Sequence, residues 1–348
     1  MRSKYWDGWK GLCIIEVVAG HAIFSNLAFP LGSSGWYAET LSIQLFNFPV
    51  AVFLAIAGFF SLGRSGGAQI ENAGSYYRRR FMRIIPPYLI WTAVYLLLQL
   101  REHPLSLHDV SREVLLGTGM GIGFFIIVLV QFILLTPLLS RLNDRRTHLI
   151  LMAALFLCGV LFTYGVRMGM PGSRWAHFPY DSLPFFAWYP SYHLGLFAAK
   201  FNLAEDPRLR RLSAWLIPSY LVFAAVAMAE GIYLASLDNP LGISQLKASS
   251  LIISTIVFLL ALSGRPRALA HLFNNNFLGF LGRESYAIYL THLIFLPRVA
   301  RLINISMHLP ISRVLGVALI MLVTLLLSAI LAGLLRKVSQ KYQELVAA

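Results

Sequence analysis

The stretch VLGVALIMLVTLLLSAILAGLL, residues 314–335, contains no charged side chain. As an α-helix it would extend for slightly more than about 30 Å, the thickness of the hydrocarbon core of a bilayer. The stretch therefore predicts a transmembrane helix.

Apolar blocks of this kind recur along the whole chain and predict about ten transmembrane helices. The 348 residues are 57% hydrophobic and only 13% charged, with a mean hydropathy of +0.67, whereas soluble domains carry about 25% charged residues. We expect an all-α polytopic membrane protein, with residues 1–348 forming a single domain and no fused soluble domain. The predicted blocks are 11–29, 41–63, 84–100, 114–137, 149–166, 184–199, 213–235, 243–263, 285–297 and 314–335.

Lysine and arginine residues are distributed unequally between alternate connections, with 21 on one side and 8 on the other when Lys247 is counted in the smaller group. Positive charge marks the cytoplasmic side, so the bias predicts an even number of spans with both termini in the cytoplasm. Because the basic residues lie between apolar blocks, the net charge of +14 indicates membrane orientation and no nucleic-acid binding. The two cysteines both lie in apolar blocks and predict neither a disulfide framework nor a thiolate metal site; we expect no metal.

Three ionisable residues interrupt the first block, WKGLCIIEVVAGHA, residues 9–22. Lys10 and His21 share nearly the same helix face and lie about 16 Å apart along the axis. A histidine at membrane depth is either a functional group or a hydrogen-bonded link between helices, and a neutral imidazole there suits general-base chemistry. Glu16 points about 140° away from His21; it is a candidate catalytic residue of unassigned role.

The stretch YYRRRFMRIIPPYLIW, residues 76–91, places four arginines at the cytoplasmic start of a helix. Arg80 and Arg83 are neighbours on the helix surface because they are three positions apart. Guanidinium groups arranged in this way suit phosphate binding, although orientation in the membrane or contact with anionic lipid explains a single arginine equally well. Arg79 is included in the candidate phosphate site.

A second histidine lies in an apolar segment, in GRESYAIYLTHLIF, residues 282–295. Ser285, Tyr289 and His292 follow one helix face, and polar groups on such a face either hold helices together or line a site. His193, in WYPSYHLGLFAAK, is a further polar candidate near a helix end. The loop 167–182, RMGMPGSRWAHFPYDS, carries aromatic and polar groups that are typical of sugar contacts and also of membrane-interface belts.

Four features together resemble the integral-membrane acyltransferase-3 family: Lys10 and His21 on the first helix, GFF at residues 58–60, the arginines Arg80 and Arg83 in the connection before the third helix, and SYAIYLTH at residues 285–292. The resemblance extends in order over nearly the whole chain. It implies about ten helices and transfer of an acyl group, usually acetyl, from cytoplasmic acyl-coenzyme A to a carbohydrate hydroxyl.

By this resemblance His21 is the catalytic histidine, Lys10 is the basic partner on its helix, and Arg80 and Arg83 would contact the phosphates of the acetyl-CoA donor. Glu16 stands where the family would have an aliphatic residue. From their positions in the sequence, His292 and Glu16 are further catalytic candidates. Lys10 and Arg79 are further donor contacts, and Ser285, Tyr289 and His193 are candidate acceptor contacts. The implied partners are acyl-coenzyme A, a cell-surface or lipid-linked glycan and the lipid bilayer of a bacterial inner membrane; a homo-oligomeric state stays open. The alternatives are an acyltransferase with a small-molecule or lipid acceptor, a non-catalytic glycan-binding or assembly subunit and a proton-coupled transporter.

Overall fold

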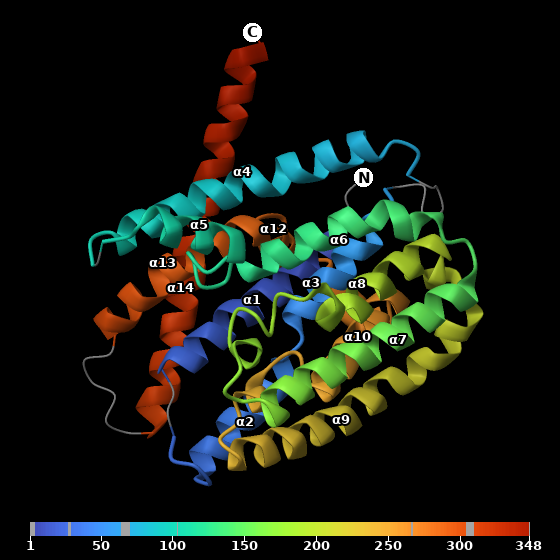
Figure 1. The fold of residues 1–348 in the computed structure, drawn as a ribbon, viewed down its shortest axis with the longest axis horizontal. Helices are drawn as coiled ribbons and strands as arrows, with labels where there is room; N and C mark the ends of the chain where they lie inside the picture. The colour runs from blue at the N-terminus through green and yellow to red at the C-terminus, as the bar shows by residue number, and fades with distance from the viewer. Residues whose placement is uncertain are drawn as a thin grey trace. The chain divides into compact units, whose positions relative to one another are not determined.

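The computed structural model describes residues 4–26, 29–63, 70–102, 104–265, 267–303 and 310–347, and every regular element in these ranges is helical (Figure 1). The prediction of an all-α fold is thus confirmed. The chain forms two compact units, of which the first comprises Met1–Phe46 with Pro266–Ala348 and the second Asn47–Arg265. Arg2 and Arg64, which contribute to the predicted charge bias, lie outside the described residues.

The first unit joins the N-terminal and C-terminal helices. In Figure 1, α13 and α14 run side by side. An apolar cluster formed by Ala22, Leu296, Val299, Ala300, Val317 and Ile320 connects α1, α13 and α14. The helices of this unit are α1 (Lys4–Asn26), α2 (Ser34–Phe46), α11 (Arg267–Phe273), α12 (Asn276–Arg283), α13 (Ser285–Ile303) and α14 (Pro310–Ala347).

Glycines allow α1 and α12 to approach at backbone distance. A Cβ atom on Gly11 would lie 2.2 Å from the Leu278 carbonyl oxygen, and one on Gly282 would lie 1.7 Å from the Asp7 carbonyl oxygen. Neither position has room for a larger residue, so the close packing depends on the missing side chains. This contact fixes α1, and with it His21, against the segment that leads into α13.

The second unit is a bundle in which α8 packs against α3 and α7. Its core surrounds Phe132, Tyr189 and Tyr192. Gly58, in the GFF stretch, and Gly195 permit the α3–α8 contact, because Cβ atoms there would lie 2.1 and 1.8 Å from backbone carbonyl oxygens. Its elements are α3 (Pro49–Phe59), α4 (Ala73–Gln99), α5 (Leu107–Leu116), α6 (Phe124–Arg141), α7 (Arg145–Tyr164), α8 (Phe185–Lys200), α9 (Pro207–Ser236), α10 (Ala248–Ser263) and the short turns η1 (Gly165–Gly169), η2 (Arg174–Ala176), η3 (Leu203–Glu205) and η4 (Pro240–Ile243).

Within the described residues, eight helical segments are long and apolar enough to cross a membrane. Each of the ten predicted blocks is at least partly helical, but α1 and α8 are absent from the eight. Helix α1 is too polar, because it contains Lys4, Asp7, Lys10 and Glu16. Helix α8 is too short, with 16 residues. Exposed apolar side chains such as Trp215 on α9, 69% exposed, suit a lipid environment.

Several predicted boundaries were wrong. Helix α4 was predicted to begin near residue 84 but begins at Ala73. Asn72 caps it there by accepting a hydrogen bond from the Ser75 amide, 2.8 Å away. The block 114–137 is divided, since α5 ends at Gly117 in the left-handed conformation and α6 begins at Phe124. The segment 41–63 is likewise interrupted before Pro49.

The predicted block 285–297 is longer than expected. Helix α13 continues through Pro297 to Ile303. The proline removes one backbone donor, while the Arg298 guanidinium donates a hydrogen bond to the Ile294 carbonyl oxygen close to this point.

Candidate active site

His21 and His292 lie next to one another in the first unit. Their ring centroids are 5.3 Å apart, with an angle of 43° between the ring planes. His21 is half-buried on α1, whereas His292 on α13 is fully buried. The sequence marked both residues as candidates on separate helices, and the fold brings the two imidazoles together.

The hydrogen bonds of His292 determine which of its nitrogens is available. Its Nδ1 lies 2.8 Å from the Tyr289 carbonyl oxygen and 3.2 Å from that of Ile288. A carbonyl oxygen only accepts, so in the neutral ring the proton is on Nδ1 and the lone pair is on Nε2. This Nε2 is buried and has no hydrogen-bond partner in the described structure. The ring thus has an unused acceptor for a proton or a hydroxyl group.

Ser285 and Tyr289 are on the same helix as His292, and both are buried. The Ser285 hydroxyl donates a hydrogen bond of 3.0 Å to the Gly282 carbonyl oxygen. The Tyr289 ring lies 6.1 Å from the His292 ring, centroid to centroid. The predicted polar face of this segment is therefore directed into the protein.

Glu16 is buried on α1, 8% exposed, and its Oε2 has no hydrogen-bond partner. Among the described residues no ion pair involves this side chain. Burial of a carboxyl group without a partner lowers the stability of the fold, and such groups in membrane helices are functional candidates. Its catalytic role stays a prediction.

Lys10 is paired within α1. Its ammonium group lies 2.6 Å from Asp7 Oδ1, and the Asp7 side chain is only 3% exposed. Asp7 was missed in the sequence, although it stands three positions before Lys10 and so shares its helix face. The pair offsets much of the positive charge that Lys10 would present to an anion.

The arginines on α4 differ in their surroundings. Arg80 donates hydrogen bonds to the carbonyl oxygens of Phe60, at 2.6 Å, and Ser61, at 2.9 Å, and thereby caps the end of α3. Arg79 and Arg83 are exposed, and within the described ranges neither makes an ion pair or a side-chain hydrogen bond. The cluster thus contains one arginine held by the fold and others turned outward.

Comparison with models of known protein families matched residues 3–333 to the acyltransferase-3 model, described as an acyltransferase domain. The chain belongs to the acyltransferase-3 family. No curated protein and no solved structure matched it. Together with the eight apolar helices, family membership makes the protein a membrane acyltransferase.

His193 of this acyltransferase belongs to a second histidine pair, in the second unit. His193 Nε2 lies 2.6 Å from His148 Nδ1, and His148 Nε2 lies 2.9 Å from the Leu142 carbonyl oxygen. The carbonyl requires a proton on His148 Nε2, so in the neutral pair His193 donates to His148. His148 was missed in the sequence, where it immediately precedes the block 149–166. A substrate contact of His193 stays a prediction.

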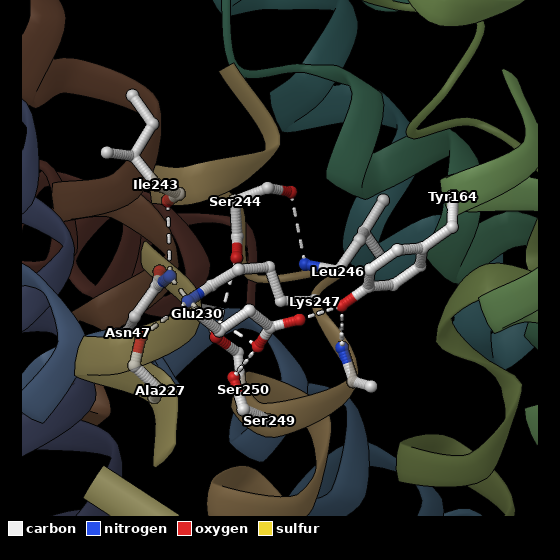
Figure 2. Close-up of polar contacts among 11 residues, drawn as sticks. Asn47, Tyr164, Ala227, Glu230, Ile243, Ser244, Leu246, Lys247, Ser249 and Ser250 are labelled. Atoms are coloured by element: carbon white, nitrogen blue, oxygen red, sulfur yellow. Dashed lines mark hydrogen bonds and ion pairs between the residues drawn. The ribbon is translucent and has the colours of Figure 1, made fainter. Parts of the chain in front are cut away.

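A buried polar cluster joins α7, α9 and the start of α10 in the acyltransferase. Figure 2 shows the Glu230 carboxylate between the Tyr164 hydroxyl and Lys247; it also accepts a hydrogen bond from Ser249. Lys247 is fully buried, lies 3.9 Å from Glu230 Oε2 and donates to the Ala227 carbonyl oxygen at 3.2 Å. Lys247 was counted with the smaller group of basic residues; its side chain is buried within the second unit. The reasoning that singled out Glu16, a carboxylate in an apolar block, applies equally to Glu230.

Among the described residues, no group of three or more His, Cys, Asp or Glu side chains is arranged to hold a metal ion.

Proposed function

We propose that the protein is an O-acyltransferase that moves an acetyl group from cytoplasmic acetyl-CoA to a hydroxyl of a cell-surface or lipid-linked polysaccharide in a bacterial inner membrane. In this proposal the chain spans the membrane about ten times, with α1 and α8 added to the eight apolar segments and both termini in the cytoplasm. The 21 to 8 distribution of basic residues supports that orientation.

The observation that carries the proposal is the His21–His292 pair. His292 is oriented by two backbone carbonyls and has an unpartnered Nε2. His21 has no hydrogen bond within the described residues. Imidazoles that only joined helices would use their nitrogens in hydrogen bonds, so this arrangement is better suited to proton transfer.

The reaction follows from a neutral His21 acting as general base. His21 removes the proton of the acceptor hydroxyl as its oxygen attacks the thioester carbonyl carbon, which forms a C–O bond. The C–S bond then breaks, and the imidazolium returns the proton to the departing thiolate sulfur. The products are an ester and free coenzyme A, and both imidazoles end the cycle neutral.

We assign Arg79, Arg80 and Arg83 to the phosphates of acetyl-CoA. Arg79 and Arg83 are exposed and bear no ion pair in the described residues, so their guanidinium groups are available for phosphate oxygens. Arg80, which caps α3, would add positive charge and hold the surface in place. Lys10, already paired with Asp7, would contribute to a smaller extent.

On the acceptor side, Ser285 and Tyr289 share a helix with His292 and supply hydroxyl groups next to it in sequence. Hydroxyl groups suit recognition of a sugar because they both donate and accept hydrogen bonds.

The test is transfer of radiolabelled acetyl from acetyl-CoA to crude cell-surface glycan, in membranes with matched amounts of folded protein. His21→Ala should lower transfer by a factor of roughly 100 to 10,000, the range of general-base catalysis. His108→Ala, a change at an exposed histidine on α5, is the matched control and should have no effect. Equal transfer in wild type and His21→Ala would refute the role of His21, and transfer in neither would refute the donor or acceptor.

A further inference from the structure

A pocket of about 390 Å³ lies in the second unit, where the loop after α7 meets the turn between α9 and α10. Its volume falls within the roughly 300–1,000 Å³ of small-molecule sites. It has no part in the chemistry assigned to His21 and His292. The principal lining residues are Arg167, Met168, Pro171, His177, Leu237 and Asp238.

The walls of this pocket are held firmly. Arg167 forms an ion pair with Asp181 across the loop, and both side chains are largely buried. Asn239 on the opposite wall donates to the Arg167 carbonyl oxygen at 3.0 Å. The cluster of Tyr164, Glu230 and Lys247 joins the three helices from which these walls extend (Figure 2). The pocket is therefore formed before any ligand binds.

Three polar groups at the pocket are uncommitted. The side chains of His177 and Asp238 are exposed and make no hydrogen bond or ion pair within the part of the chain that the structure describes. The Nε of Arg167 is buried without a hydrogen-bond partner. A carboxylate, an imidazole and an N–H group together can accept from and donate to several hydroxyl groups of one ligand.

The remaining lining and the local charge restrict the class of ligand. Met168, Pro171 and Leu237 offer apolar surface of the kind that packs against the C–H face of a sugar ring. The Arg167 charge is offset by Asp181, and Arg174 lies over the rings of Trp175 and Tyr180, 5.3 and 5.7 Å from their centroids. With Asp238 at its rim, the pocket is poorly suited to an anion such as acetyl-CoA.

We propose that this pocket binds a sugar residue of the acceptor, with Asp238 and His177 as its hydrogen-bonding groups. The choice of a saccharide rests on the proposed function. The inference deepens that function by adding a contact for a further sugar residue of the acceptor in the second unit, on residues 167–177 and 237–240, besides the hydroxyl groups of Ser285 and Tyr289 in the first unit.

The direct test is saturation-transfer NMR on the purified protein, in a detergent without a sugar head group. The probes are the methyl glycosides of glucose, galactose, mannose, rhamnose and N-acetylglucosamine. At least one should bind the wild type, and Asp238→Asn and His177→Ala should each weaken it about tenfold, equivalent to one charge-assisted hydrogen bond. Asp238 has a φ of 52°, which asparagine also tolerates.

The controls are Glu71→Gln and His108→Ala, which alter exposed side chains outside the pocket and should leave glycoside binding unchanged. Acetyl-CoA should not displace a bound glycoside. Absence of binding by every glycoside, or equal affinity in wild type and both pocket variants, would overturn the inference.

The same variants separate this inference from the proposed function. In the label-transfer assay, Asp238→Asn should raise the KM for the acceptor glycan about tenfold and leave the KM for acetyl-CoA unchanged. Glycoside binding without any acetyl transfer would refute the proposed function and retain the site. Transfer with an unaltered acceptor KM and no glycoside binding would refute the site and retain the function.

Discussion

The two histidine pairs of this acyltransferase differ in how their nitrogens are used. In the second unit, His193 donates to His148, and His148 donates to the Leu142 carbonyl oxygen, so the rings form a continuous chain of hydrogen bonds. In the first unit, His21 and His292 are adjacent, but they are not hydrogen-bonded to each other. Each pair has one buried nitrogen without a partner in the described structure, Nδ1 of His193 and Nε2 of His292, so the pairs differ in the bond between the rings.

The difference teaches that burial alone does not identify a reactive histidine. Two rings that are hydrogen-bonded to each other stabilise the fold through that bond, and disturbing it should change stability first. Two adjacent rings without such a bond gain no stability from one, so removal of the His292 Nε2 should change activity first. Each prediction below tests one side of this division.

After His21→Ala, the largest effect is expected for His292→Asn. The asparagine amide can replace the Nδ1 donor to the Tyr289 carbonyl oxygen but has no atom equivalent to Nε2. Acetyl transfer should fall about 100-fold, in the range of acid–base catalysis, while the free energy of unfolding changes by less than about 1 kcal/mol. Activity and thermal unfolding are measured on the same preparation; a large stability loss with normal activity would place His292 among the structural histidines.

The next largest effect concerns the Glu230–Lys247 pair. Glu230→Gln removes the carboxylate that faces a fully buried ammonium and should destabilise the protein by about 3 kcal/mol. Lys247→Met should cost less, because the Glu230 side chain is 20% exposed and still accepts hydrogen bonds from Tyr164 and Ser249.

The double variant Glu230→Gln with Lys247→Met is the control for this pair. It should be more stable than the sum of the single effects implies, because no unmatched charge remains. Unfolding by titration with a denaturing detergent measures all three variants, and strict additivity would show that the two charges are not coupled.

A smaller loss of stability is expected for His148→Phe. Phenylalanine cannot accept the hydrogen bond from His193, and an unsatisfied buried donor costs roughly 1–3 kcal/mol. Adding His193→Phe should restore part of this loss, since two apolar rings leave no unsatisfied N–H. Acetyl transfer per folded molecule should be nearly unchanged in His148→Phe; a loss of activity comparable to that of His292→Asn would remove the distinction between the pairs.

The sequence alone predicted the all-α fold and the candidate residues in the first unit. Long apolar blocks have few alternatives to helices in a membrane, and the histidines at positions 21 and 292 were noticeable because polar groups are rare there. Position along a helix indicated the face that each residue occupies. It did not indicate that the two imidazoles would lie 5.3 Å apart, which depends on the packing of α1 against α12 and α13.

The hydrogen-bonded clusters of the second unit were harder to predict because their members are distant in sequence. Tyr164, Glu230 and Lys247 lie near the ends of three different helices, and the sequence does not indicate that these ends meet. The predicted helix boundaries were wrong where a capping side chain sets the first residue of the helix, as Asn72 does for α4. Such contacts are set by side-chain geometry that hydropathy does not record.

The smallest expected effect is a pH-dependent contribution of Asp144 to the stability of the helix that carries His148. Asp144 Oδ2 accepts hydrogen bonds from the Thr147 amide, at 2.8 Å, and hydroxyl, at 2.9 Å. These bonds hold the pKa of the Asp144 carboxyl below its ordinary value. Its stabilisation is therefore complete above about pH 4, the unfolded pKa, and is lost as the pH falls through the lower folded pKa.

Asp144→Asn isolates this contribution, because asparagine still caps a helix but does not titrate. The thermal midpoint of wild type should exceed that of Asp144→Asn slightly at neutral pH, and the difference should vanish in acid. Subtracting the two curves removes the titration of the histidines, which both proteins share. A difference that persists below the folded pKa would show that it does not come from the charge of the Asp144 carboxylate.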